Sequence, residues 1–371
     1  MAYLGEEIAK LGFGFMRLPM IGQEVDIEQT KAMVDLFISK GFTYFDSSWG
    51  YLGGKSEEAM RTAIVERYPR DSFQIATKCP VWIVRTEEEA KGMFWTSLKR
   101  SGAGYIDYYL LHNLGGSRTA RFDDFRMWDY VQELKKEGLV RHVGFSIHDK
   151  ADALDKILTE HPEMEFVQFQ LNYDDWESPT IQARKCYEVA RKHHKPIIVM
   201  EPVKGGILAN PLENVRRLLE DANPSASPAS WAIRFAASME GIITVLSGMS
   251  TIDQVRDNVS YMEKFIPLDG GESAVIERVR KLIAEIPRIP CTACEYCVEG
   301  CPRNIQIPSI FEAYNRKLVH KDLVGAQSRY GLATRSGGKA SDCIACGNCE
   351  RVCPQHIGIV QNMKTIAQEL E

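Results

Sequence analysis

The chain has 371 residues, of which 44% are hydrophobic, 26% charged and 9% aromatic, as in ordinary soluble globular proteins with a sizeable core. Its formal net charge is −5, and no basic block interrupts the mixture of charges, which argues against nucleic acid or an anionic membrane surface as a partner. The first residues are acidic where a secretory signal would be basic, and no apolar run approaches the roughly 20 residues that span a bilayer. We therefore expect a cytoplasmic protein that acts on small molecules.

Short apolar runs rich in β-branched and aromatic residues alternate along the chain with stretches of helical period. Eight such runs are predicted strands, at 11–16, 43–47, 73–79, 106–112, 140–147, 166–173, 196–203 and 243–249. Helices are predicted between them, for example over 27–40 and 85–102, and Ser56 is a suitable N-cap for a helix that follows it. Eight strands alternating with helices predict a (β/α)8 TIM barrel. An open doubly wound sheet is the alternative, but the first strand lacks its Gly-x-Gly-x-x-Gly turn.

A predicted helix within 273–290 ends in a proline-bounded segment, which marks a domain boundary. We expect the barrel over residues 1–285 and a small α-rich domain of the bacterial ferredoxin type over 286–371. Residues 307–318 form the one clear helical pattern between the two cysteine motifs of that domain.

Eight of the ten cysteines lie in two copies of Cys-x2-Cys-x2-Cys-x3-Cys-Pro, "CTACEYCVEGCP" at 291–302 and "CIACGNCERVCP" at 343–354. Grouped cysteines in a reducing compartment indicate metal rather than disulfides. In two-cluster ferredoxins with this motif, the fourth cysteine of each copy ligates the other cluster. We therefore expect two [4Fe–4S] clusters, cluster 1 on Cys291, Cys294, Cys297 and Cys353, and cluster 2 on Cys343, Cys346, Cys349 and Cys301.

Structural zinc is the alternative for these cysteines, but zinc ribbons use two Cys-x2-Cys pairs around one ion. Triplets followed by Cys-Pro, twice over, fit that arrangement poorly. The domain has few large apolar side chains, so it needs bound metal to stabilise its fold.

Four titratable side chains stand where predicted barrel strands end, the edge at which barrel enzymes carry their chemistry. Asp46, Lys78 and His112 close the second, third and fourth strands, and Tyr51 follows in the loop after Asp46. Lys78 near the phenol would lower the pKa of Tyr51, and Asp46 would pair with Lys78. His112 would donate to the phenol or orient a carbonyl. Each residue alone has an ordinary structural explanation, so the predicted proton donor depends on all four together.

The stretch "YFDSSWGYLGGKSEEAM", followed by "ATK" and "LLH", resembles the aldo/keto reductase family. "LGFGFMRLPM", "GFSIHD", "QLNYDDW" and "MEPVKGG" resemble the branch of that family with a C-terminal two-cluster ferredoxin domain, and the resemblance covers essentially the whole chain. It implies that Asp46, Tyr51, Lys78 and His112 reduce a carbonyl with hydride from a nicotinamide cofactor, Tyr51 supplying the proton.

The resemblance also implies a set of cofactor contacts. Tyr173 would stack on the nicotinamide, Gln170 would bond its carboxamide, and Ser146 would lie nearby. The residues that would line the pyrophosphate channel are Pro202, Gly205, Gly206 and Leu208. The residues that would approach the adenosine end are Ser247, Gly248 and Ser250, with Gln254 and Asn258 on the adenine. For the glycines, ordinary turn chemistry is an equal explanation.

The chain departs from the family's pattern at two places. Ile147 follows Ser146, where many members have Asn. Gly248, Met249 and Gln254 stand where the family holds the 2′-phosphate of NADP with Lys or Arg, so the charge-assisted partners of that phosphate are missing there. The choice between NAD, NADP and another cofactor is therefore open.

Three functions compete at this point. The first is an NAD(P)H-dependent reductase of a carbonyl substrate, or the reverse alcohol dehydrogenase, with clusters that are structural or relay electrons. The second holds a flavin in the barrel and exchanges electrons, through the clusters, with a ferredoxin or flavodoxin carrier. The third is a docking module on an inactive barrel, which the intact tetrad disfavours. Trp49, Trp82 and Asn113 are expected to shape the substrate pocket beside Tyr51, with a place in the core as the equal structural explanation for each tryptophan.

Overall fold

The computed structural model describes residues 3–371, and the chain forms two compact units. The first unit comprises Met1–Val203 and Leu219–Ala274, and the second comprises Lys204–Leu218 and Val275–Glu371. The segment that follows the seventh barrel strand therefore groups with the cysteine-bearing part of the chain. The predicted division at residue 285 lies just beyond helix α11 (Gly270–Ala284) and stays a prediction.

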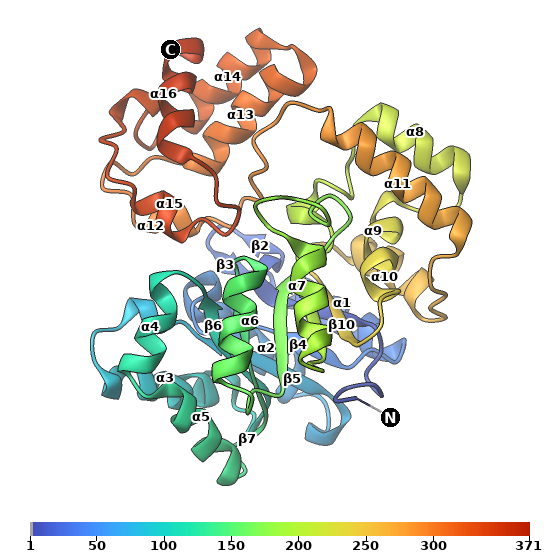
Figure 1. Cartoon of the computed structure of the whole chain (residues 1–371), viewed down its shortest axis with the longest axis vertical. Helices are drawn as coiled ribbons and strands as arrows, with labels where there is room; N and C mark the ends of the chain where they lie inside the picture. Colours follow the sequence, from blue (N-terminus) through green and yellow to red (C-terminus); the bar gives the residue numbers. More distant parts are fainter. Residues whose placement is uncertain (1–2) are drawn as a thin grey trace. The chain divides into compact units, whose positions relative to one another are not determined.

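The first unit is built around a closed parallel barrel, which confirms the predicted fold class (Figure 1). Around the barrel the order is β1-β10-β9-β8-β7-β6-β5-β4, with each strand beside its neighbours in the chain order of barrel strands. The strands are β1 (Leu11–Gly14), β4 (Tyr44–Asp46), β5 (Gln74–Cys79), β6 (Ile106–Leu114), β7 (Val140–Ile147), β8 (Phe166–Gln170), β9 (Ile197–Met200) and β10 (Ile242–Ser247). A separate antiparallel pair, β2 (Met20–Ile21) and β3 (Glu24–Val25), follows β1.

Both faces of the barrel strands are covered, which explains why they are recognised as continuous apolar runs rather than as alternating patterns. All nine residues of β6 are buried, for example, including its polar ones. The helices of this unit are α1 (Ile27–Ser39), α2 (Lys55–Met60), α3 (Glu87–Ser101), α4 (Ser117–Asp124), α5 (Met127–Lys136), α6 (Ala151–Glu160), α7 (Ala183–Lys192), α9 (Pro228–Ala237) and α10 (Ile252–Met262). Helix α8 (Glu213–Ala222) crosses the division between the units.

Local signals set the ends of α3. At its start, Thr86 and Glu89 form a capping box, in which the backbone N–H of Glu89 donates to Thr86 Oγ1 at 3.2 Å. At its end, Gly102 adopts φ 64°, the left-handed conformation that terminates helices.

Several sequence expectations need correction, among them the predicted strands at 166–173 and 196–203, which end at Gln170 and Met200. Helix α2 begins at Lys55 with Gly54 as its N-cap, so Ser56 is not the cap. Ser56 lies inside the helix instead, and its buried hydroxyl bonds Ser47 Oγ at 2.7 Å and donates to the carbonyl of Phe15 at 3.0 Å. The first strand stops at Gly14 because the next three residues form a 3₁₀ turn. A second helix, α14 (Leu323–Ala333), lies between the two cysteine motifs.

The second unit is mainly helical. Its further helices are α12 (Tyr296–Glu299), α13 (Ile307–His320), α15 (Asn348–Val352) and α16 (Ile359–Leu370). A small core of buried side chains from α13, α14 and α16 forms a continuous cluster with the cysteine loops, with Ile310, Phe311 and Met363 fully buried. Among the residues from 3 onward, no helix is both long and apolar enough to cross a membrane.

Candidate functional site

Three adjacent barrel strands carry the predicted tetrad. Asp46 ends β4, Lys78 lies near the end of β5, and His112 lies on β6. The parallel register pairs Asp46 with Ala76 and Lys78 with Leu110, so the three side chains come from neighbouring positions at one edge of the barrel. All three are buried, with exposed fractions of 3%, 0% and 5% for Asp46, Lys78 and His112 respectively.

Asp46 and Lys78 form a buried ion pair between the Asp46 Oδ1 and Lys78 Nζ atoms. The Lys78 ammonium also donates to the backbone oxygen of Ser47 at 2.6 Å. Burial raises the pKa of Asp46 and lowers the pKa of Lys78, and the charge of each partner opposes the shift of the other. The pair therefore holds a positive charge at a fixed place in a site from which water is largely excluded.

Tyr51 lies beside this pair. It begins a 3₁₀ turn in which Leu52, Gly53 and Gly54 all adopt positive φ values of 53°, 65° and 94°. Two consecutive glycines make that turn possible at low cost. The Lys78 Nζ atom stands 5.1 Å from the centroid of the Tyr51 ring, and the His112 ring packs edge-on against it at 5.8 Å. The structure thus brings all four predicted catalytic residues together.

His112 is a neutral base at ordinary pH. Burial, together with the nearby charge of Lys78, lowers the pKa of His112 well below its usual value. Its Nδ1 atom lies 3.0 Å from the hydroxyl oxygen of Ser48. The same hydroxyl also lies 3.5 Å from the backbone oxygen of Lys78, so the direction of its bond to Nδ1 depends on the tautomer of His112. The tautomer that can donate from Nε2 to a carbonyl oxygen is the one in which Ser48 donates to Nδ1. Sequence reasoning missed Ser48, although it follows Asp46 by only two residues.

Two of the predicted pocket residues lie at this site. The Trp82 ring is 5.2 Å from the His112 ring, and Asn113 is buried directly after His112 with φ 58°. The Asn113 Oδ1 atom is buried without a hydrogen-bond partner among the described residues. Trp49 is half-buried, stacks under the Arg100 guanidinium at 4.6 Å and packs against the main core, as its structural explanation predicts.

The residues predicted around the nicotinamide lie on the next two strands or, for Tyr173, in the loop just after them. The Ser146 hydroxyl, on β7, accepts from the backbone N–H of Asn113 at 2.8 Å. Gln170 ends β8 and its Nε2 donates to Asp175 Oδ2 at 2.5 Å. The Tyr173 ring is fully buried and packs edge-on against Phe235 at 5.9 Å. Their contacts with a cofactor stay predictions.

The residues predicted at the adenosine end cluster where β10 enters α10. The Asn258 side chain is committed within the protein, because its Nδ2 donates to Ser247 Oγ at 2.7 Å and its Oδ1 accepts from Tyr261 at 2.7 Å. Gln254 is exposed on the first turn of α10, and its side-chain oxygen accepts from the backbone N–H of Ser250 at 2.7 Å. Their contacts with adenosine stay predictions.

Arg17 is a cation that the sequence reasoning did not find near this end. The Ser250 hydroxyl donates to the backbone oxygen of Arg17 at 2.7 Å. A Cβ atom on Gly248 would stand 3.4 Å from Arg17 Cδ, so the arginine stem lies against that glycine. Arg17 is 231 residues away from Gly248 in sequence, and only the pairing of β1 with β10, which sets Phe13 beside Ser247, reveals the proximity.

The residues predicted to line the pyrophosphate channel fall on both sides of the division between units. Pro202 belongs to the first unit, whereas Gly205, Gly206 and Leu208 belong to the second. Within the second unit, Gly205 has φ 63°, and a Cβ atom there would stand 2.6 Å from the backbone oxygen of Thr292. This glycine is required by close packing against the first cysteine loop, and its contact with a cofactor stays a prediction.

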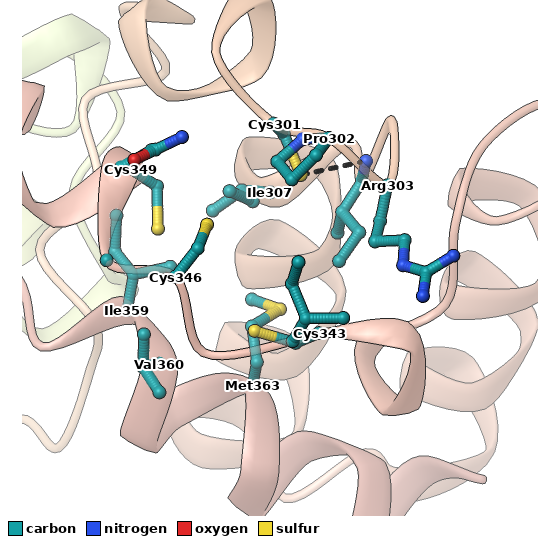
Figure 2. A pocket seen from close by; sticks show the side chains of 14 residues that line it. Cys301, Pro302, Arg303, Ile307, Cys343, Cys346, Cys349, Ile359, Val360 and Met363 are labelled. Carbon is teal, nitrogen blue, oxygen red and sulfur yellow. Dashed lines mark hydrogen bonds between the residues drawn. The ribbon is translucent and has the colours of Figure 1, made fainter.

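The eight motif cysteines converge on two cavities of the second unit. One cavity is lined by Cys291, Cys294 and Cys297 together with Cys353 from the second motif. The other is lined by Cys343, Cys346 and Cys349 together with Cys301 from the first motif, and Figure 2 shows these four side chains around one space. These are the two crossed sets of four that the sequence predicts.

The two cysteine loops have the same backbone shape. Ala293 and Glu295 in the first loop adopt φ values of 51° and 64°, and Ala345 and Gly347 at the matching positions of the second adopt 55° and 72°. Among the residues that the structure describes, no three His, Cys, Asp or Glu side chains stand close enough to hold a single metal ion.

A parallel barrel that gathers Asp46, Tyr51, Lys78 and His112 at its strand ends defines an oxidoreductase of the aldo/keto reductase type. The chain belongs to the aldo/keto reductase family, whose model matches residues 10–281. A 4Fe-4S dicluster domain model matches residues 290–358, so the C-terminal part is an iron–sulfur domain.

Individual relatives support this assignment. The chain is 24% identical, over 60% of its length and 79% of the relative, to the NADH-specific methylglyoxal reductase of Escherichia coli. It is 25% identical, over 68% of its length and 81% of the relative, to an uncharacterized oxidoreductase of Schizosaccharomyces pombe.

Solved structures share the barrel fold. The holo form of aldo-keto reductase AKR11C1 from Bacillus halodurans superposes with a TM-score of 0.58 at 23% identity, covering 73% of this chain and 92% of that one. An aldo-keto reductase from Klebsiella pneumoniae in complex with NADPH gives a TM-score of 0.58 at 21% identity, with 74% and 91% covered.

Proposed function

We propose that the barrel reduces the carbonyl of an aldehyde or ketone to an alcohol, or catalyses the reverse reaction, with a nicotinamide dinucleotide as hydride donor. The observation that carries this proposal is the buried Asp46–Lys78 pair, whose Lys78 Nζ atom stands 5.1 Å from the centroid of the Tyr51 ring. A fixed cation beside a phenol stabilises the phenolate that remains after Tyr51 has given its proton to the developing alkoxide.

The other residues of the site have separate tasks. His112 stays neutral because of its burial and can donate from Nε2 to the substrate oxygen, which orients the carbonyl without adding a second charge. Trp82 packs beside His112 and would form an apolar wall against the substrate. Ser48 holds the His112 ring by its Nδ1 atom. The proton source, the orienting donor and the wall all belong to the first unit.

The polar groups near the tetrad fit a nicotinamide. The buried Asn113 oxygen is an acceptor in need of a donor, which the carboxamide of such a cofactor offers. When bound, the cofactor supplies the hydride. Ser146 and Gln170 stand on the two following strands, where they would hold the carboxamide, and Arg17 beside Gly248 would meet a phosphate of the adenosine half.

We further propose that each cysteine cavity of the second unit holds one [4Fe–4S] cluster. The support is the donor set, because each cavity is lined by three cysteines of one motif and the fourth of the other. These clusters would tie together two loops that are about fifty residues apart, since Cys291 and Cys343 begin the two motifs.

The test of the barrel chemistry uses protein purified without oxygen. Wild type and Tyr51→Phe are compared for NAD(P)H oxidation with a panel of aldehydes and ketones, while iron content and visible absorption are recorded. We expect Tyr51→Phe to lower kcat by about 10³-fold or more and to leave the absorption of the iron–sulfur domain unchanged.

Unchanged turnover in Tyr51→Phe would contradict the proposed proton donor. Release and identification of bound nucleotide from the same preparation separates the two cofactor hypotheses, since a bound flavin would replace the nicotinamide proposal with the electron-transfer alternative.

A further inference from the structure

The turn that carries Tyr51 is tied to strand β5 just before the tyrosine. The backbone N–H of Trp49 donates to the carbonyl of Lys78 at 3.1 Å, and the backbone N–H of Tyr51 donates to the carbonyl of Ser48 at 3.1 Å. Trp49 therefore connects the turn to the residue whose ammonium stands 5.1 Å from the centroid of the Tyr51 ring. Whatever holds Trp49 in place also sets the distance between the phenol and that ammonium.

Arg100, in the last turn of helix α3, contacts both ends of the turn that carries Tyr51. Its Nη1 atom donates to the backbone oxygen of Trp49 at 2.9 Å, and its guanidinium lies over the Trp49 ring at 4.6 Å from the centroid. At the other end of the turn, a Cβ atom on Gly54 would stand 2.7 Å from the Arg100 Cζ atom, so the guanidinium lies directly against that glycine. One side chain therefore touches the backbone before and after the tyrosine.

A buried carboxylate on helix α2 fixes the Arg100 guanidinium. The Glu57 Oε2 atom lies 3.4 Å from Arg100 Nη1, and the Thr77 hydroxyl on β5 donates to Glu57 Oε1 at 2.6 Å. Burial raises the pKa of Glu57, and the bond from Thr77 and the charge of Arg100 oppose that shift. Because Thr77 directly precedes Lys78, the carboxylate joins Arg100 to the strand that carries the ammonium.

Arg100 uses its planar guanidinium for several contacts at once. The Glu57 carboxylate, the backbone oxygen of Trp49 and the Trp49 ring all lie against the same group. An ion pair with Glu57 alone could be made by the single charge of a lysine, whereas the flat fork of an arginine is needed to reach all three together. The geometry therefore gives Arg100 a second task besides compensating a buried carboxylate.

We propose that Arg100 is a positioning residue for Tyr51. The Arg100 clamp, as we name this set of contacts, joins the guanidinium to Trp49, Gly54 and Glu57. It holds the turn against β5 and so keeps the phenol beside the buried ammonium. The inference rests on the proposed role of Tyr51 as proton donor. Because a displacement of about 1 Å in a reacting group can cost about 10²-fold in rate, a loose turn would lower turnover although every group of the tetrad is still present.

Arg70 provides a matched control in the same unit. Its Nη2 atom also pairs with a buried carboxylate, Asp107 Oδ2 at 2.6 Å, and its guanidinium lies over the Tyr105 ring at 3.7 Å. The Arg70 side chain is 21% exposed, close to the 23% of Arg100. Asp107 stands near the start of β6, whereas His112 stands near its end. Arg70→Lys therefore changes a similar ion pair at the other end of the strand.

The test compares wild type, Arg100→Lys and Arg70→Lys, all purified without oxygen. Steady-state oxidation of NAD(P)H with an aldehyde gives kcat and KM, and hydrogen exchange read by mass spectrometry reports the backbone amides of residues 49–54. Arg100→Lys should lower kcat about 10-fold or more and leave KM within about 2-fold, because the groups that contact the substrate are unchanged. Exchange over residues 49–54 should rise about 10-fold or more. Arg70→Lys should stay within about 2-fold of wild type in kcat and in this exchange.

Arg100→Ala gives a second readout, which a general loss of stability would not produce. The substitution leaves a space beside Trp49 and Glu57 that matches the group it removes. Added guanidinium ion, at concentrations well below those that unfold the protein, should raise the kcat of Arg100→Ala several-fold, whereas the same concentration of potassium chloride should leave it unchanged. Arg70→Ala, treated in the same way, should show no such rise in kcat.

The Arg100 clamp would be overturned by a kcat of Arg100→Lys within about 2-fold of wild type, by an equal fall of kcat in Arg70→Lys, or by unchanged exchange over residues 49–54. It would also be overturned by guanidinium that leaves the kcat of Arg100→Ala unchanged. A wild type without carbonyl turnover would instead overturn the proposed barrel chemistry, and the exchange over residues 49–54 would still show whether Arg100 holds the turn.

Discussion

The barrel and the iron–sulfur domain position their reactive groups by different means. In the barrel, Asp46, Lys78 and His112 sit on adjacent strands within a large buried core, so their places are set by strand register alone. In the smaller domain six of the eight motif cysteines lie on loops with left-handed residues such as Ala293 and Ala345, and the other two, Cys297 and Cys349, lie in the short helices α12 and α15. A ligand that is bonded directly to the cysteines can be held by loops. A proton donor whose pKa depends on the exact positions of its neighbours needs the fixed register of strands.

Removal of iron tests this difference between the barrel and the iron–sulfur domain most directly. Anaerobic chelation should expose the amides of α13 to hydrogen exchange, raising their exchange rates by about 100-fold or more, because the loops around it lose their common ligand. The amides of β6 should keep their protection. Hydrogen exchange read by mass spectrometry measures both regions in one experiment.

The control for iron removal is Cys186→Ser, which alters a buried cysteine of the barrel outside both motifs and should leave iron content unchanged. Equal protection of α13 with and without iron would mean that the domain's own apolar core suffices to fold it.

The second prediction tests the barrel's part of the comparison. Asp46→Asn leaves the Lys78 ammonium buried without a carboxylate, so the free energy of unfolding should fall by about 3–5 kcal/mol. All six tryptophans precede residue 232, so urea unfolding followed by tryptophan fluorescence reports the barrel. Asp35→Asn is the matched control, because it breaks an exposed pair with Arg67 and should cost less than about 1 kcal/mol. Similar losses in both variants would contradict a stabilising role specific to the buried pair.

The third prediction concerns pH. The pKa of His112 is depressed in the folded protein, so below the ordinary value near 6.5 the unfolded chain binds a proton that the folded protein does not. Stability contributed by neutral His112 is therefore full above about pH 6.5 and declines as pH falls. Between pH 7.5 and 5.5 the wild type should lose about 1 kcal/mol more than His112→Gln, measured by the same urea unfolding. Parallel losses in the two proteins would assign the pH dependence to other groups.

The smallest expected effect is on cofactor choice. Arg17→Gln should weaken NADPH binding about 5-fold, or about 1 kcal/mol, and leave NADH binding nearly unchanged, if the arginine meets the 2′-phosphate. Cofactor fluorescence titration measures both affinities without turnover. Arg256→Gln is the control, since Arg256 pairs with Asp253 on the exposed side of α10. An equal loss for both cofactors would point to the pyrophosphate instead.

Most of the barrel could be predicted from the sequence because its signals are local. Strands buried on both faces show as apolar runs, and Asp46, Lys78 and His112 stand at the ends of such runs, so these three follow from strand assignment, whereas Tyr51 lies in the loop after Asp46. The crossed cysteine sets follow from the spacing of the motifs in the same way.

The remaining features depend on contacts that spacing does not encode. Arg17 reaches Gly248 only through the closure of the barrel between its first and last strands. Ser56 resembles a cap, but its hydroxyl serves a distant carbonyl at Phe15. Helix α14 carries Gly325 and Gly331, which weaken its helical pattern although packing against α13 supports it. Tertiary contacts override local preference at each of these places.

The crossing of Cys301 and Cys353 has a consequence for assembly. If the proposed clusters occupy the two cavities, neither motif can complete a cluster site alone, because each cavity is lined by three cysteines of one motif and one cysteine of the other. A chain that has received one cluster has already brought both loops together, so the second site is prepared before its iron arrives. Cluster loading would therefore be cooperative. When iron is limiting, most molecules would hold either no cluster or both clusters, and few would hold one. The fraction of fully loaded molecules would then rise steeply over a narrow range of iron supply instead of rising gradually.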